Sequence, residues 1–136
     1  MVPVSTSRNG QTALLSQDLL TFYRRVAASS LTVVDVETTG SRPHQSRVIE
    51  VAVVQGSLAA GMAFETSFLI NAEVPVPRSI TRLTGITTEM LQQGSPAEMV
   101  WDQVLPQLRQ GVLTGHNLAF DYGFLQAEYR KLGKSF

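Results

Sequence analysis

The sequence predicts a single α/β domain in which helices cover a mixed β-sheet. Three observations predict it: strand-like hydrophobic runs come first along the chain, amphipathic helical patterns follow, and a short strand separates the last two helical patterns. The length of 136 residues and the hydrophobic content of 43% suit one domain with a sizeable core. We expect residues 1–14 to form a flexible lead-in and residues 15–136 to form the domain.

The first half of the chain predicts one helix and then three strands. Ser16 is a good N-cap for a helix that continues to Ala28 with a broad apolar face. The first strand reads as a buried one, and Gly56 and Gly61 mark the turn between the second and third strands, which indicates a meander. The expected strands span residues 31–36, 47–55 and 63–70.

The middle of the chain predicts a loop, short helical turns and a longer helix. Two prolines make residues 73–79 (EVPVPRS) a loop, and the following turns are expected to break at Gly85. Ser95 is the expected cap of the longer helix, with Pro96 in its first turn and Gly111 as its stop. Pro106 is a position where this helix would kink or shorten. The residues expected to face inward are Met99, Val100, Val104 and Leu108.

The last two expected elements are a strand and a helix. Residues 112–114 predict a short strand, and Asn117 is a good N-cap for a helix that runs to Gly133. Together with the earlier strands, this order indicates the mixed sheet covered by helices.

The composition limits the possible functions. Eleven basic and eleven acidic residues give a net charge of zero, which excludes a polycation that coats nucleic acid through bulk electrostatics. The chain has no Cys, which excludes disulfides, thiolate metal sites and a Cys nucleophile. It also has no signal-like N-terminal core and no run of 18 apolar residues, so we expect a cytoplasmic protein without membrane contact.

Two acids end the most strand-like segment, VVDVETTG (residues 33–40). Side chains alternate along a strand, so Asp35 and Glu37 should share a face with Cα atoms roughly 6.6 Å apart. Two carboxylates this close repel each other, and a cation beside them would offset that cost. Oxygen ligands without Cys favour Mg²⁺ or Mn²⁺, which leave room for phosphate oxygens and water. The alternative is that both acids mark only the exposed end of a strand before a turn.

A second acidic motif is GHNLAFD (residues 115–121). If Asn117 caps the helix, Asp121 lies about one turn inside it and can point back toward the strand ends. Phe120 fits either core packing or a platform that stacks on a base. His116 fits either a structural histidine or a proton carrier.

These motifs, in this order, resemble the DnaQ-like (DEDD) 3′-5′ exonuclease superfamily, especially the proofreading domain of the DNA polymerase III epsilon type. The resemblance rests on DVETTG, RVIEVAVV, LTGIT and GHNLAFDYGFL, and it runs from about residue 31 to 133. It implies a ribonuclease H-like fold with a five-stranded mixed sheet. It also implies catalytic, metal-binding roles for Asp35, Glu37 and Asp121, which would hold a pair of Mg²⁺ or Mn²⁺ ions.

The same resemblance implies which residues meet the substrate. Thr38, Thr39 and Gly40 match the part that approaches the terminal nucleotide, and Asn117 and Phe120 are expected to contact it as well. Thr84 stands where many relatives have a His. The implied substrate is a single-stranded or frayed 3′ end of DNA, with RNA as an alternative, from which nucleoside 5′-monophosphates are released. A DNA polymerase subunit is the implied protein partner.

After Asp121 the sequence departs from the family pattern. The third motif of the family supplies a general-base His or Tyr and a fourth Asp, and nothing in YGFLQAEYRKLGKSF matches it. We therefore expect Phe136 to be a truncation point and the fold to be incomplete at the C-terminus. With three acids and no positioned base, the chain alone should turn over slowly or not at all. His116 as a substitute base is a further alternative.

Two other functional classes stay open: a non-catalytic module that binds nucleic acid or a polymerase, and an unrelated α/β domain with acids at loop mouths. Glu50 is expected to be structural. The remaining basic side chains near the motifs are expected to form a solvated face that could guide a phosphate backbone: Arg42, Arg47, Arg78 and Arg82.

Overall fold

A computed structural model describes residues 3–6, 12–14 and 16–136 of the chain. The main sheet consists of β3 (Leu31–Thr38), β4 (Val48–Ser57), β5 (Gly61–Asn71), β6 (Ser95–Pro96) and β7 (Val112–Thr114). Its strand order is β6-β5-β4-β3-β7. Strands β3, β4 and β5 form an antiparallel meander, whereas β7 is parallel to β3 and β6 is parallel to β5. The predicted α/β fold with a five-stranded mixed sheet is therefore confirmed.

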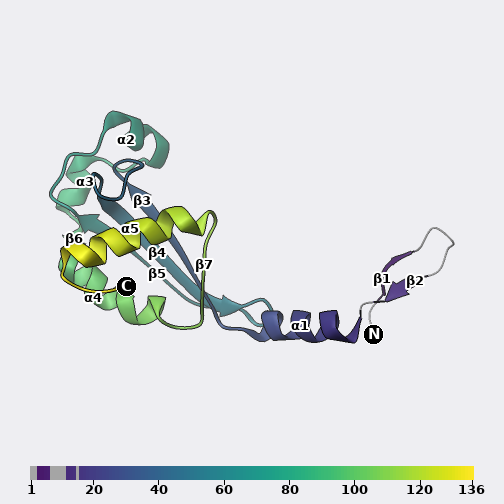
Figure 1. Cartoon of the computed structure of the whole chain (residues 1–136). Helices are drawn as coiled ribbons and strands as arrows, with labels where there is room; N and C mark the ends of the chain where they lie inside the picture. The colour runs from purple at the N-terminus through teal and green to yellow at the C-terminus, as the bar shows by residue number, and fades with distance from the viewer. Residues whose placement is uncertain (1–2, 7–11, 15) are drawn as a thin grey trace.

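Five helices flank or extend this sheet: α1 (Gln17–Ala28), α2 (Arg78–Thr84), α3 (Thr88–Gln92), α4 (Ala97–Leu108) and α5 (Leu118–Lys131). Figure 1 shows α5 crossing in front of the sheet, and the buried side chains of α4 and α5 share one core with those of the strands. None of the helices in the described ranges is long and apolar enough to cross a membrane.

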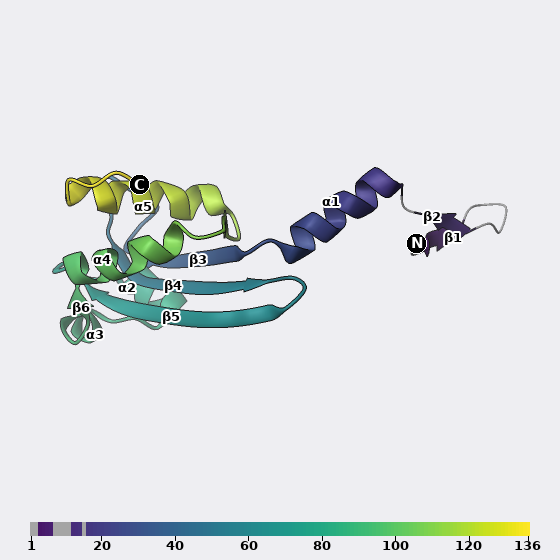
Figure 2. The same ribbon diagram turned by 90° about the horizontal axis from the view of Figure 1, so that it is seen from below.

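Helix α1 begins as predicted, because the Leu19 amide donates to the Ser16 hydroxyl at 3.1 Å. Figure 2 shows that α1 runs away from the sheet toward a short antiparallel pair, β1 (Pro3–Thr6) and β2 (Thr12–Leu14). The aperiodic sequence did not predict this pair. Residues 1–2 and 7–11 of the expected lead-in, and residue 15 at the start of the expected domain, lie outside the described residues. Of the apolar face of α1, Leu20 is buried, while Phe22 and Tyr23 are exposed.

Strand β3 starts at the predicted residue and ends two residues later than predicted. Burial alternates along the strand: Val34 and Val36 are buried, whereas Val33 and Asp35 are exposed. The expectation of a buried strand is therefore correct for one face only, the face that shares a core with α4 and α5. The turn between β4 and β5 lies at residues 58–60, so the two predicted glycines flank it within the strands.

The start of α4 corrects two predictions. Ser95 does not cap the helix, because it pairs with Ile70 in the parallel ladder between β6 and β5, and sheet pairing prevails over the local capping signal. Met99 is exposed rather than inward, and Trp101 is buried instead. At 100° per residue, Trp101 lies on the same arc as the buried valines and Met99 lies nearly opposite that arc. The helix passes Pro106 and ends at Leu108.

The start of α5 is at the predicted position but has a different geometry. Asn117 takes a left-handed conformation with φ 53°, and its side chain makes no capping hydrogen bond. The prediction that Asn117 is the N-cap residue is therefore confirmed, although it caps without a side-chain hydrogen bond. The helix ends at Lys131, and the expected last residue, Gly133, has a positive φ of 70° just beyond it.

Candidate functional site

The acids of DVETTG lie at the end of β3, on the face of the strand opposite the core. The register places Asp35 opposite Ala52 and Glu37 opposite Glu50 on β4. A bulge between Glu37 and Thr38 ends the regular ladder and starts the turn. The shared face that alternation predicted for the two acids is therefore present.

Helix α5 brings a third carboxylate to this strand. Asp121 lies in the first turn of the helix, is only 3% exposed, and accepts a hydrogen bond from the Val36 amide at 3.0 Å through Oδ1. Val36 stands between the two strand acids in the sequence, so this hydrogen bond joins α5 to the centre of the motif. The structure places Asp121 where the sequence led us to expect it.

Burial and the negative charges of neighbouring carboxylates raise the pKa values of Glu37 and Asp121. Burial raises the pKa of Glu37, and the charges of Asp35, Glu50 and Asp121 raise it further. Burial also raises the pKa of Asp121, while the hydrogen bond from Val36 and the charge of His116 oppose that rise. Mutual repulsion of this kind is what a bound cation would relieve.

The donor set fits a hard divalent cation in its chemistry. Carboxylate oxygens are the ligands that Mg²⁺ and Mn²⁺ prefer, and repulsion among the acids leaves negative charge uncompensated. Within the described part of the chain, however, no three His, Cys, Asp or Glu side chains are grouped so that they could hold a metal ion. One oxygen of Asp121 is already engaged with the backbone of β3.

The turn after the acids is held by its own hydroxyl groups. Thr38 Oγ1 donates to the Gly40 carbonyl at 2.6 Å, and Thr39 Oγ1 accepts from the Arg47 amide at 3.0 Å. A Cβ atom on Gly40 would lie 2.5 Å from Ser46 Oγ, so glycine permits this close approach. The turn is therefore compact, and both threonine hydroxyls stabilise it.

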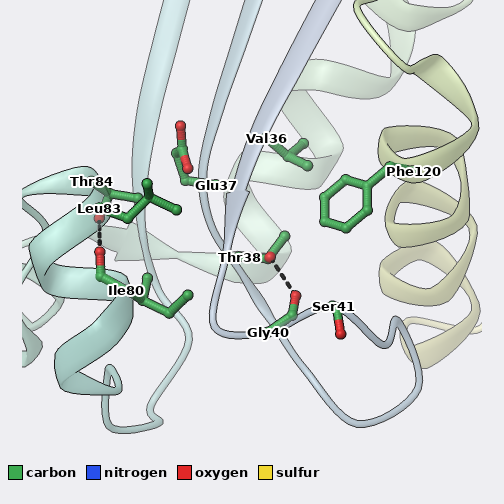
Figure 3. Close-up of a pocket in the computed structure, with 9 residues that line it drawn as sticks. All are labelled: Val36, Glu37, Thr38, Gly40, Ser41, Ile80, Leu83, Thr84 and Phe120. Atoms are coloured by element: carbon green, nitrogen blue, oxygen red, sulfur yellow. Dashed lines mark hydrogen bonds between the residues drawn. The ribbon is translucent and has the colours of Figure 1, made fainter.

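A pocket of about 320 Å³ opens beside these residues. Figure 3 shows Phe120 on α5 facing Ile80 and Leu83 on α2 across the end of β3, with Glu37 at the rim. Leu83 is 80% exposed and Phe120 is 36% exposed, so both present apolar surface to the solvent. The pocket combines apolar walls with one carboxylate.

The other predicted substrate-binding residues have different surroundings. Thr84 lines the pocket, but its hydroxyl donates to the Ile80 carbonyl and accepts from the Ile86 amide, so it is occupied in ending α2 (Figure 3). Asn117 is exposed and is not part of the pocket lining. Phe120 packs on Phe124 with ring centroids 4.9 Å apart while it lines the pocket, which agrees with both interpretations of this residue.

For two residues near the site, the role predicted from the sequence was incomplete or wrong. Glu50 was expected to be only structural, yet it faces Glu37 across the strands, and the meander register was the signal that could have revealed this. Arg47 was expected on a solvated face, yet its Nε lies 3.0 Å from an oxygen of the buried Glu128. That expectation is wrong for Arg47, whereas Arg42, Arg78 and Arg82 are exposed as predicted.

The sequence pattern of a known protein family, described as Exonuclease, matches residues 32–135. The chain belongs to this exonuclease family. The 3′-5′ exonuclease DinG of Bacillus subtilis is 36% identical over 103 residues, which are 74% of this chain and 11% of that protein. DNA polymerase III PolC-type of Clostridium perfringens is 35% identical over 108 residues, which are 76% of this chain and 7% of that protein. The chain thus spans a small part of the curated relatives it matches.

Solved exonuclease structures share the fold. Exonuclease I of Methylocaldum szegediense superposes with a TM-score of 0.68 at 23% identity, covering 76% of this chain and 24% of that one. E. coli exonuclease I in complex with a dA16 oligonucleotide gives a TM-score of 0.70 at 16% identity, covering 79% and 25%. The resemblance to DnaQ-like exonucleases is therefore confirmed at the level of family and fold.

Proposed function

We propose that this chain carries the acidic half of a metal-dependent exonuclease site that removes nucleotides from the 3′ end of DNA. The observation that carries the proposal is that Asp35 and Glu37 share one face of β3 while Asp121 is hydrogen-bonded to Val36 between them, in a chain of the exonuclease family. The 3′-5′ direction is supported by the relative in Bacillus subtilis, and DNA as substrate by the polymerase relatives. The proposed products are nucleoside 5′-monophosphates.

In this proposal Asp35, Glu37 and Asp121 hold two divalent ions, Mg²⁺ or Mn²⁺. When bound, such ions would supply Lewis-acid chemistry for activating water and for stabilising the leaving oxygen of a phosphodiester. The chain itself supplies the negative charge that retains the ions and, through the Val36 amide, the orientation of Asp121. Because the chain has a net charge of zero, it has no general electrostatic attraction for phosphate. Bound ions would provide that attraction locally.

The pocket is the proposed place for the terminal base. Phe120 offers an aromatic face for stacking, and Leu83 offers apolar contact from the opposite side. The compact turn from Thr38 to Gly40 allows the backbone to approach the last sugar and phosphate closely. Since a paired base cannot enter such a pocket, single-stranded or frayed ends are the proposed substrates.

A non-catalytic binding module is the second candidate. It is favoured by the absence of a three-ligand metal group among the described residues. In this case the pocket and the exposed arginines would bind a nucleic-acid end or a polymerase without cleavage.

The test is hydrolysis of 5′-labelled single-stranded DNA and RNA oligonucleotides with Mg²⁺ or Mn²⁺, compared with EDTA. Because the chain lacks a positioned base, we expect only slow metal-dependent shortening from the 3′ end, and no activity for Asp35→Asn. Glu65→Gln is the matched control, because Glu65 lies on β5 of the same sheet, opposite Val54 rather than opposite one of the three acids. Binding of the oligonucleotides without cleavage would favour the module, and activity that survives Asp35→Asn would contradict the proposed site.

A further inference from the structure

We propose that the ion pair between Arg47 and Glu128 is a positioning device that fixes the carboxylate of Asp121 against the strand-end acids. The inference rests on the proposed metal site and assigns to it two residues outside the motifs that carry the acids. Arg47 directly precedes β4, and Glu128 lies in the second half of α5. Neither residue is proposed to touch metal or substrate.

The first step is the spacing along α5. Glu128 follows Asp121 by seven residues, which is close to two helical turns, so both side chains leave the same side of the helix. Both are buried, with exposed fractions of 2% and 3%. Each carboxylate accepts a hydrogen bond of 3.0 Å from a backbone amide of the sheet. Asp121 accepts from Val36 on β3, and Glu128 accepts from Val48 on β4. Two carboxylates therefore attach one helix to two neighbouring strands.

The second step is the fork between the two charges. Arg47 Nε donates to Glu128 Oε1 at 3.0 Å, and Nη2 donates to Oε2 at 3.1 Å. A forked pair fixes direction as well as distance, which a single contact does not. Because Oε1 also accepts from Val48, the carboxylate of Glu128 has little freedom to rotate.

The third step connects this pair to the turn after the acids. The Arg47 amide donates to Thr39 Oγ1, and the Thr39 amide donates to the Arg47 carbonyl at 2.9 Å. Arg47 is thus bound through its backbone to the turn that follows Glu37 and through its side chain to α5. A continuous chain of hydrogen bonds runs from the acidic motif to the helix that carries Asp121.

A stabilising role alone explains this pair poorly. Glu128 is buried and Arg47 is partly exposed, so forming the pair costs desolvation energy, and such an ion pair often stabilises a fold no better than apolar residues of similar size. Its geometric effect is different, because ligands of a metal site depend on partners that hold their orientation. Loss of such a partner typically lowers metal affinity about 10–100-fold. We therefore expect loss of the pair to lower metal affinity in addition to lowering stability.

The experiment measures Mn²⁺ binding to the chain by calorimetry and by electron paramagnetic resonance, together with thermal unfolding in EDTA. The variants are Glu128→Gln, which removes the charge but keeps an acceptor, and Arg47→Lys, which keeps the charge but removes the fork. The matched control is Asp102→Asn, because Asp102 on α4 pairs at the surface with Lys134, which lies beyond the end of α5. We expect the Mn²⁺ dissociation constant to rise at least about tenfold in both variants. The control should keep the wild-type value.

The double variant Glu128→Gln with Arg47→Lys should bind Mn²⁺ about as weakly as either single variant, since each change breaks the same pair. Folded variants with wild-type affinity would overturn the inference, and so would a loss of affinity that is fully additive. If both variants fail to fold, Thr39→Val removes the acceptor for the Arg47 amide and leaves the buried pair intact. It should still weaken Mn²⁺ binding, and unchanged binding would overturn the inference.

Asp35→Asn separates this inference from the proposed function. If it abolishes Mn²⁺ binding while Glu128→Gln does not weaken it, only the positioning role is refuted. If the wild-type chain binds no Mn²⁺, or if Asp35→Asn binds it normally, the proposed metal site is refuted and the positioning role with it.

Discussion

Glu37 on β3 and Glu50 on β4 lie directly opposite each other in the antiparallel ladder. Like charges in this position destabilise a sheet. The pKa of Glu37 rises first because the side chain is desolvated, and then because Asp35, Glu50 and Asp121 add negative potential. The sheet therefore carries a local repulsion at the place where the proposed cations would bind.

Replacing Glu50 should make the metal-free chain more stable. We expect Glu50→Gln to raise the free energy of unfolding by about 0.2–1 kcal/mol, because it removes the like charge opposite Glu37. Urea unfolding in EDTA measures this change. Glu65→Gln should have a smaller effect, since Glu65 faces Val54. A loss of stability in Glu50→Gln would show that Glu50 makes a favourable contact instead.

Phe120 should contribute to binding of a single-stranded end. We expect Phe120→Leu to weaken binding of a short DNA oligonucleotide by about 1–3 kcal/mol, the usual loss when one base loses its aromatic partner. Fluorescence anisotropy of a labelled oligonucleotide measures the affinity. Tyr122→Leu is the control, because Tyr122 is 39% exposed on the same helix but packs on Phe136 rather than lining the pocket. Equal affinities for both variants would exclude stacking on Phe120.

Gly111 should tolerate substitution less well than Gly133. Both have positive φ after a helix, but a Cβ on Gly111 would lie 2.4 Å from the Ser30 carbonyl oxygen, whereas nothing lies within 4 Å at Gly133. We expect Gly133→Ala to cost about 1–2 kcal/mol from conformation alone. Gly111→Ala should cost more, because the clash also disturbs the hydrogen bond that the Val112 amide donates to the Ser30 carbonyl at the start of β7. Thermal unfolding of both variants makes the comparison, and equal losses would contradict it.

Tyr129 should make the fold sensitive to alkali. Burial raises the pKa of its hydroxyl, which donates to the Trp101 carbonyl at 2.9 Å. Since the folded pKa lies above the unfolded one, the folded chain holds its proton longer, and stability falls as the pH rises above about 10. Tyr129→Phe should cost about 0.5–1.5 kcal/mol at neutral pH through the lost hydrogen bond.

The same variant should lose less stability than wild type between neutral pH and pH 11. Urea unfolding across that range measures the slope, and Tyr122→Phe controls for removal of an exposed tyrosine. Parallel slopes for Tyr129→Phe and wild type would mean that Tyr129 does not carry the alkaline sensitivity.

The regular elements could be predicted because their signals are local. Alternation in β3, the Ser16 cap of α1 and the left-handed Gly85 that ends α2 are all properties of neighbouring residues. Ser95 was misassigned because its partner, Ile70, is distant in the sequence and decides its conformation. Local signals therefore fail where pairing between distant segments competes with them.

The candidate site shows the same division. The shared face of Asp35 and Glu37 follows from strand geometry, but the role of Glu50 required the register between β3 and β4. The partnership of Arg47 with Glu128 joins residues 81 positions apart, and no pattern near either residue indicates it. Thr84 could be matched by position, yet only the structure shows that its hydroxyl is engaged in ending a helix.

The hydrogen bond between Val36 and Asp121 spans 85 residues of chain. A ribosome adds about 5–20 residues per second, so roughly 4–17 seconds separate synthesis of the acidic strand from synthesis of its helical partner. During that interval the nascent chain can form the β3–β4–β5 meander but has no third carboxylate to complete the acidic cluster. Any metal-dependent cleavage at the proposed site must therefore wait until α5 has been synthesised and has packed against the sheet.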